Sequence, residues 1–229
     1  MSELSSRELR VLHEDNHLIA VYKPSGVLTQ GDRTGDASLM DTVKAWLRER
    51  YDKPGQVFLG LVHRLDRPVS GVVLFAKTSK AASRLSQQFR ERTVDKRYLA
   101  RLEGVIAPPA GRLSCFMAQR EGERRVLVSD RALPDTKPAS LLYDTQWWQR
   151  DACIVNVTLE TGRKHQIRAQ LAHVGHPIVG DRRYGARAQL SDDAIALCAV
   201  RLTVAHPIAK QALTIALPNA LLPTLLQQP

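Results

Sequence analysis

One stretch, HRLDRPVSGVVLFAKT at residues 63–78, constrains the fold more than any other part of this chain. Strand-forming residues precede its acid in FLGLVHRLD and follow it in GVVLFAKT, and the Pro-Val-Ser-Gly between them is typical of a turn. The stretch therefore predicts two strands joined by a tight loop that contains Asp66. Loops held by rigid strands are a common location for reactive side chains.

Strand-forming runs recur along the chain, with a few helical patterns between them. Apolar residues at helical spacing predict helices over residues 38–50 and 79–94, and a third after the Thr161-Gly162 turn. Hairpin connections predominate, so we predict an α+β fold with a mixed, mostly antiparallel sheet and flanking helices. The predicted strands lie at residues 17–26, 58–66, 71–78, 96–104 and 153–159, and in a hairpin over residues 196–218.

The length of 229 residues suits one domain of moderate size, and we predict a single catalytic domain over residues 1–229. Residues 1–9 are expected to form a flexible arm and residues 218–229 a tail. No apolar run is long enough for a membrane span, and no export signal opens the sequence. Three scattered cysteines fit a reducing compartment, so we expect a soluble cytoplasmic protein, with a monomer as the default state.

Positive charge is concentrated in two segments. The formal net charge is +10, from 33 Lys and Arg against 23 Asp and Glu. Residues 63–101 carry ten basic and three acidic residues, residues 161–187 carry six and one, and the remainder is slightly acidic. A merely soluble basic protein would spread its charge more evenly, so a polyanion such as nucleic acid is the expected partner.

Asp66 is the strongest candidate for a reactive group, because it stands between Arg64 and Arg67 in the predicted loop. An Asp flanked by arginines is often a structural ion pair, and the local pattern leaves that alternative open. A nearby guanidinium also keeps a carboxylate ionised when it is shielded from water. Such a carboxylate can act as a nucleophile or a base.

Two further residues stand out among the basic stretches. Tyr98 lies in DKRYLAR on a predicted strand, where a core role is the alternative, but a ring among basic residues can stack on a nucleobase. Arg168 lies at the edge of the apolar stripe of the third helix, where a surface role is the alternative. There it can bring its planar charged group to a carboxylate. That stripe consists of Ile167, Leu171 and Val174.

The sequence contains no recognisable metal or cofactor motif. His173 and His176 are three residues apart, but no further Cys, His or acid joins them at ligand spacing, so no zinc site is predicted. No phosphate-binding glycine loop is present either. We therefore expect neither a metal nor an organic cofactor.

Four stretches together resemble the successive motifs of the RluA family of RNA pseudouridine synthases. In order, they are VYKPSGVLTQ, HRLDRPVSGVVLFAKT, KRYLARLEG and LETGRKHQIRAQLAHVGHPIVGDRRYG, and the similarity spans residues 11–217. Val69 departs from the pattern, because the family often has Thr there, and a turn hydrogen bond is in doubt. The small N-terminal RNA-binding domain that many members carry is not expected in this chain.

This resemblance implies a pseudouridine-synthase catalytic fold and a set of site residues. It makes Asp66 the catalytic residue, Tyr98 the ring that stacks on the target uracil, and Arg168 the partner of Asp66. Arg64 is implied to contact or displace RNA bases. The neighbours of these residues are assigned to substrate binding together with Arg64, namely Arg67, Lys96 and Ile167.

The resulting prediction is an enzyme that isomerises a uridine in an RNA stem-loop, with ribosomal RNA favoured and transfer RNA second. One carboxylate suffices for this isomerisation, whereas glycoside hydrolysis requires two. The other acids near the motifs, Asp95 and Asp181, lack a matching basic frame, which favours an isomerase over a hydrolase. The alternative is a non-catalytic RNA-binding protein or RNA-folding chaperone, which would need the basic surface but not Asp66.

Overall fold

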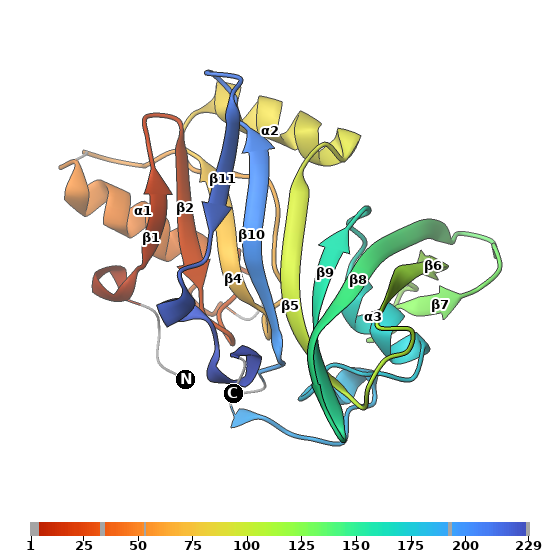
Figure 1. The fold of residues 1–229 in the computed structure, drawn as a ribbon. Coiled ribbons are helices and arrows are strands. Elements are labelled where there is room, and N and C mark those ends of the chain that lie inside the picture. The colour runs from red at the N-terminus through yellow and green to blue at the C-terminus, as the bar shows by residue number, and fades with distance from the viewer. Residues whose placement is uncertain (1–4, 33–34, 53, 192–193, 228–229) are drawn as a thin grey trace. The chain divides into compact units, whose positions relative to one another are not determined.

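The computed structural model describes residues 5–32, 35–52, 54–191 and 194–227 (Figure 1). The chain divides into two compact units, which are described separately. Unit 1 consists of Met1–Val94 and Ala199–Leu221, and unit 2 consists of Asp95–Cys198 and Leu222–Pro229.

Unit 1 combines a sheet with two helical segments, α1 (Leu39–Arg50) and α2 (Ser79–Glu91). Its strands are β1 (Val11–Glu14), β2 (Leu18–Lys23), β3 (Gly60–Leu61), β4 (Ser70–Ala76), β10 (Leu197–Ala205) and β11 (Ala212–Ala216). They pair in the order β1-β2-β4-β10, with β3 on β4 and β11 on β10. The pairs β1–β2, β2–β4, β3–β4 and β10–β11 are antiparallel.

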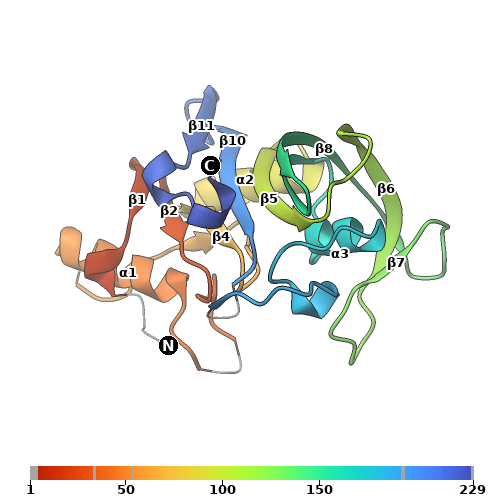
Figure 2. The same ribbon diagram turned by 60° about the horizontal axis from the view of Figure 1, so that its bottom comes forward.

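Unit 2 has a second run of strands and the helix α3 (Gln166–His173). The strands are β5 (Asp95–Glu103), β6 (Ala110–Ala118), β7 (Leu127–Ser129), β8 (Lys137–Gln149) and β9 (Ala152–Leu159). They pair antiparallel in the order β5-β9-β8-β6-β7. Figure 2 shows α3 beside β6 and β8, and the side chain of Gln170 in α3 donates to backbone carbonyls of both strands. The predicted α+β class with a mostly antiparallel sheet is confirmed.

The central strand of unit 1 is β4, and every one of its residues is buried. Leu74 belongs to a core cluster with Ala81 and Leu85, which face it from α2. At Gly71, an added Cβ would lie 2.3 Å from the carbonyl oxygen of Ala199 in β10. Only glycine allows the neighbouring backbone to approach β4 so closely.

The predicted helices of unit 1 begin at side chains that cap them. Ser38 accepts a hydrogen bond from the backbone of Asp41, whose carboxylate accepts one from the backbone of Ser38, so the two form a capping box for α1. Thr78 caps α2 by accepting the backbone N–H of Ala81. The helical periodicity and these caps are both local, which is why the sequence predicted α1 and α2 correctly.

The ends of the chain have more structure than an arm and a tail would. Ser6–Glu8 forms a 3-10 turn, the hydroxyl of Ser6 donates to Glu49, and Leu9 is buried. Near the other end Leu226 is buried. The remainder of the expected arm and tail, residues 1–4 and 228–229, lies outside the described residues.

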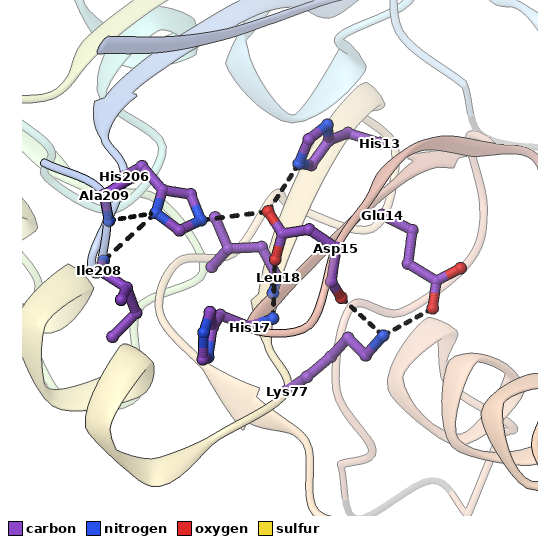
Figure 3. A network of polar contacts seen from close by, with 9 residues as sticks. All are labelled: His13, Glu14, Asp15, His17, Leu18, Lys77, His206, Ile208 and Ala209. Atoms are coloured by element: carbon purple, nitrogen blue, oxygen red, sulfur yellow. Dashed lines mark hydrogen bonds and ion pairs between the residues drawn. The ribbon is translucent and has the colours of Figure 1, made fainter. Parts of the chain in front are cut away.

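A polar network centred on Asp15 joins the β1–β2 turn to the β10–β11 hairpin (Figure 3). One carboxylate oxygen of Asp15 accepts the backbone N–H groups of His17 and Leu18, at 2.7 and 2.9 Å. The other oxygen lies 3.0 Å from Nε2 of His13 and 3.1 Å from Nε2 of His206. Burial raises the pKa of Asp15, but these four hydrogen bonds outweigh it and lower the pKa from 3.8 to about 2.

The backbone around His206 determines which of its nitrogens carries the proton. Its Nδ1 accepts the backbone N–H groups of Ile208 and Ala209, so a neutral ring must carry its proton on Nε2 and donate it to Asp15. In this tautomer Nε2 is not available to bind a metal ion, and the network is a structural connection between two hairpins.

We expect Asp15→Asn to lower the free energy of unfolding by about 1–3 kcal/mol near neutral pH, because charged hydrogen bonds are lost. Asp15 has a folded-state pKa below its unfolded value, so its stabilising effect is complete above about pH 5 and is lost as the pH falls toward 2. Urea unfolding at several pH values should show the difference between variant and wild type shrinking over that range. A difference independent of pH would contradict this account.

Candidate functional site

Asp66 lies in the loop between β3 and β4, as the sequence predicted, and it is half-buried between the buried residues Leu65 and Val69. The backbone N–H of Val69 donates to the carbonyl of Asp66 at 3.0 Å and closes a tight turn. The turn therefore has a backbone hydrogen bond although position 69 lacks the hydroxyl of the family's usual threonine.

The strand expected before this loop is shorter than predicted, since only Gly60–Leu61 pairs as β3. The physical reason is His63, whose Nε2 accepts the backbone N–H of Leu74 at 2.9 Å. The imidazole also stacks on Phe89 of α2, with the ring centroids 5.0 Å apart. A side chain thus replaces the backbone pairing along β4, and the chain leaves the strand just before Asp66.

The segment that follows β2, residues 24–29, holds this loop by its backbone. The hydroxyl of Thr29 donates to the carbonyl of Leu65 and accepts its N–H. The hydroxyl of Ser25 donates to the carbonyl of Pro68 at 2.9 Å. The backbone N–H of Gly26 donates to the carbonyl of Arg67 at 2.9 Å. The first and second sequence motifs therefore form one structure around Asp66.

Lys23, at the end of β2, has no exposed surface and is the most completely buried cation near the loop. Its Nζ donates to the backbone carbonyls of Pro24, Val27 and Arg67, at 3.0, 2.7 and 3.0 Å. Burial and, to a smaller extent, the charge of Arg67 lower the pKa of Lys23, the charge of Asp66 raises it, and the net result is a pKa of about 7. Three carbonyl acceptors require three N–H donors, which only the charged ammonium provides.

The two arginines beside Asp66 differ in their surroundings. Arg64 is exposed. Arg67 donates from Nε to the carbonyl of Gly26 at 2.9 Å, and its Nη2 lies 2.9 Å from a carboxylate oxygen of Asp36. These contacts make Arg67 part of the structure that holds the loop, and its predicted contact with substrate stays a prediction.

Arg168 lies on α3 in unit 2, and its side chain is 4% exposed. Its Nε and Nη2 donate to the two carboxylate oxygens of Asp181 at 2.6 and 2.9 Å. Asp181 therefore has a basic partner that the sequence around it did not indicate. The apolar stripe also differs from the prediction, because Val174 is 41% exposed whereas Arg168 is buried. An ion pair allows the guanidinium to occupy an interior position that the periodicity assigned to apolar residues.

The other predicted residues of unit 2 lie on β5 and α3. Tyr98 and Lys96 are half-buried on β5, where Tyr98 is paired with Val157 of β9. An added Cβ at Gly162 would be 3.6 Å from Nζ of Lys96, so Lys96 reaches the turn that precedes α3. Ile167 is buried in α3.

The structure thus groups the predicted residues by unit. Asp66 lies with Arg64 and Arg67 in unit 1, and Tyr98 and Arg168 belong to unit 2. Sequence reasoning missed Lys23 and Asp181 as partners of these residues. Lys23 could have been noticed as a lone cation at the end of the apolar run LIAVYK, whereas no local signal marks Asp181 as the partner of Arg168.

A family model described as RNA pseudouridylate synthase matches residues 17–173. The chain belongs to this family. The finding confirms the resemblance to the RluA family.

Curated relatives of this chain are named ribosomal large subunit pseudouridine synthase C. One from Vibrio cholerae is 32% identical over 95% of this chain and 68% of its own length. One from Pasteurella multocida is 33% identical over 95% and 67%, and one from Buchnera aphidicola is 33% identical over 77% and 54%. The chain thus spans between about half and two thirds of the length of these relatives.

Solved structures share the fold. Human RNA pseudouridylate synthase domain containing 4 superposes with a TM-score of 0.77, at 23% identity, over 94% of this chain and 89% of that one. Human RNA pseudouridylate synthase domain containing 1 gives a TM-score of 0.75, at 24% identity, over 98% and 89%. At this level of identity the likeness is one of fold.

In residues 5–32, 35–52, 54–191 and 194–227, no group of three or more His, Cys, Asp or Glu side chains is arranged to hold a metal ion. None of the helices in that part of the chain is long and apolar enough to cross a membrane.

We expect Lys23→Met to loosen the Asp66 loop, because three backbone carbonyls lose their donor. The free energy of unfolding should fall by about 1–3 kcal/mol and the single-turnover rate on RNA by about tenfold or more. Lys77→Met is the matched control, since Lys77 is also largely buried and donates to Glu14 and Asp15 away from the loop. A Lys23→Met enzyme that is destabilised but fully active would show that Lys23 does not organise the loop for catalysis.

Proposed function

We propose that this protein converts uridine to pseudouridine in RNA and that Asp66 is the reacting group. Membership of the RNA pseudouridylate synthase family supports the activity. The observation that carries the role of Asp66 is its turn, which Lys23, Thr29, Ser25 and Gly26 hold through backbone groups. These contacts hold the backbone on both sides of Asp66 in place.

The reaction needs no second acid and no added reagent. The N1–C1′ bond of the uridine breaks, the base turns, and C5 forms a new bond to C1′. C5 then loses its proton and N1 gains one, so the product is an isomer of the substrate. An ionised carboxylate can serve as a nucleophile at the sugar or as a base. The ammonium of Lys23 and the carboxylate of Asp66 attract one another.

The remaining predicted residues act on the RNA in this proposal. Tyr98 stacks on the flipped uracil, and Arg168 pairs with Asp66. Arg64 is exposed, which suits a residue that enters the space left by the flipped base. Lys96, whose amine reaches the turn before α3, contacts the substrate backbone.

We expect Asp66→Asn to abolish pseudouridine formation while leaving the affinity for RNA nearly unchanged, because the amide keeps the shape but cannot act as a nucleophile or base. Asp95→Asn is the control, since Asp95 forms an exposed ion pair with Arg97. Nucleoside analysis of the digested RNA product makes the measurement. Pseudouridine from the pure Asp66→Asn enzyme would contradict the mechanism, and release of free uracil by the wild type would indicate a hydrolase.

We expect binding to weaken steeply with salt, because the two basic segments replace counterions on RNA. Arg90→Gln in α2 and Arg182→Gln in unit 2 should each lower the log–log salt slope by about 0.7–0.9 per lost phosphate contact. Both side chains are exposed. Arg48→Gln on α1 removes the same charge outside these segments and should leave the slope unchanged. An equal change in all three variants would mean that only net charge matters.

The RNA itself is proposed to be a stem-loop of ribosomal RNA, with transfer RNA second. The curated relatives are named for the large ribosomal subunit, which supports this choice and a cytoplasmic location. Sequence-specific recognition of RNA usually targets loops whose bases can be splayed out. The monomeric state stays a prediction.

We expect faster single turnover on an isolated stem-loop than on the same sequence made unstructured, and Arg64→Ala should slow the stem-loop reaction. The stem-loop is chosen by mapping pseudouridine in total RNA from cells with and without this protein. Preference for the unstructured strand would contradict recognition by shape. An unchanged rate for Arg64→Ala would exclude that residue from base flipping.

A further inference from the structure

The short turn Asp181–Tyr184 contacts the guanidinium of Arg168 from two directions. Asp181 accepts hydrogen bonds from its Nε and Nη2 along one edge. The guanidinium carbon also lies over the ring of Tyr184, 5.2 Å from the ring centroid. The backbone N–H of Tyr184 donates to the carbonyl of Asp181 at 2.9 Å, so both contacts come from one hydrogen-bonded turn.

The ring of Tyr184 is itself fixed by hydrogen bonds to two other elements. Its hydroxyl accepts the backbone N–H of Val126 at 3.1 Å. The same hydroxyl lies 2.8 Å from Nδ1 of His165, with which it shares a hydrogen bond. His165 is the residue before α3, and Arg168 lies in the first turn of that helix. Tyr184 thus links His165, just before α3, to Val126, just before β7.

The pair of Arg168 and Asp181 is nearly removed from solvent, with side chains 4% and 2% exposed. Such a pair contributes little net stability compared with apolar residues of similar size, but it strongly fixes geometry. An arginine otherwise has many rotamers, and the two-pronged contact with the stacked ring leaves the guanidinium one orientation. The carboxylate also balances its charge, so Arg168 is suited to act as an oriented donor rather than as a long-range cation.

We propose that Asp181 and Tyr184 are positioning residues that orient Arg168 for the pseudouridylation step. This inference rests on the proposed function. In this mechanism Asp181 contacts neither the substrate nor Asp66, yet its loss slows catalysis. The residues that orient Arg168 both belong to the GDRRYG segment. Asp181 acts through Arg168 alone, so its loss has no effect once Arg168 is replaced.

The expected effect falls on the chemical step. Asp181→Asn should lower the single-turnover rate at saturating RNA by about tenfold or more, with the dissociation constant for RNA unchanged. Tyr184→Phe keeps the ring but loses both hydroxyl hydrogen bonds, and its rate should lie between those of wild type and Asp181→Asn. Asp130→Asn removes an exposed carboxylate that contacts α3 through His173 and should leave the rate unchanged.

A double-mutant cycle separates positioning from a structural role. Arg168→Lys loses the planar fork, so adding Asp181→Asn to it should cause no further loss of rate. If the rate of the double variant fell by the product of the two single losses, the proposal would be overturned. Should Asp181→Asn fail to fold, Asp181→Glu, which keeps the charge but shifts the carboxylate, completes the cycle.

The orientation of the Arg168 guanidinium can be measured independently of activity, from the NMR signal of its Nε–H. This signal is assigned by its absence in the Arg168→Lys variant. We expect slow solvent exchange of this proton in the wild type and fast exchange in Asp181→Asn. A variant with fast exchange and the wild-type rate would overturn the positioning role while leaving the proposed function intact. A wild type that forms no pseudouridine on any RNA would refute the proposed function, and the inference with it.

Discussion

The surroundings of Asp66 depend on the hydrogen bonds that the ammonium of Lys23 donates. It sits in an interior position with no exposed surface and donates to three backbone carbonyls, one of which belongs to the Asp66 loop. An interior cation without such acceptors would be very costly. The loop is therefore favoured in an arrangement in which the carbonyl of Arg67 and those of Pro24 and Val27 point at the same nitrogen. The backbone on both sides of Asp66 is thereby held in place.

Unit 2 also contains a buried cation, but this one is an arginine paired with an acid. Arg168 is also an interior cation, but a carboxylate on a nearby turn balances its charge, and its guanidinium carbon lies over the ring of Tyr184. A lysine surrounded by carbonyls organises backbone, whereas an arginine paired with an acid presents a plane of fixed orientation. The first arrangement suits the Asp66 loop, whose backbone is held in place, and the second suits Arg168, whose side chain is oriented.

Much of the fold follows from local patterns. The helices α1 and α2 were predictable because helical periodicity and capping side chains are encoded within a few residues. The β10–β11 hairpin and the strand–loop–strand around Asp66 were predictable from turn residues between strand formers. The short β3 was not, because the side chain of His63 takes a backbone partner that the pattern assigned to a strand.

The sequence by itself determined the family, the α+β class, the two basic segments and the loop that carries Asp66, because motifs, periodicity and charge are local properties. Only the tertiary structure decided which groups are partners. The sequence predicted that Arg168 lies at the edge of the apolar stripe, whereas the structure pairs it with Asp181, 13 positions away. Lys23 and the carbonyl of Arg67 are 44 positions apart. Contacts over such separations depend on how strands and turns pack, and no local pattern records them.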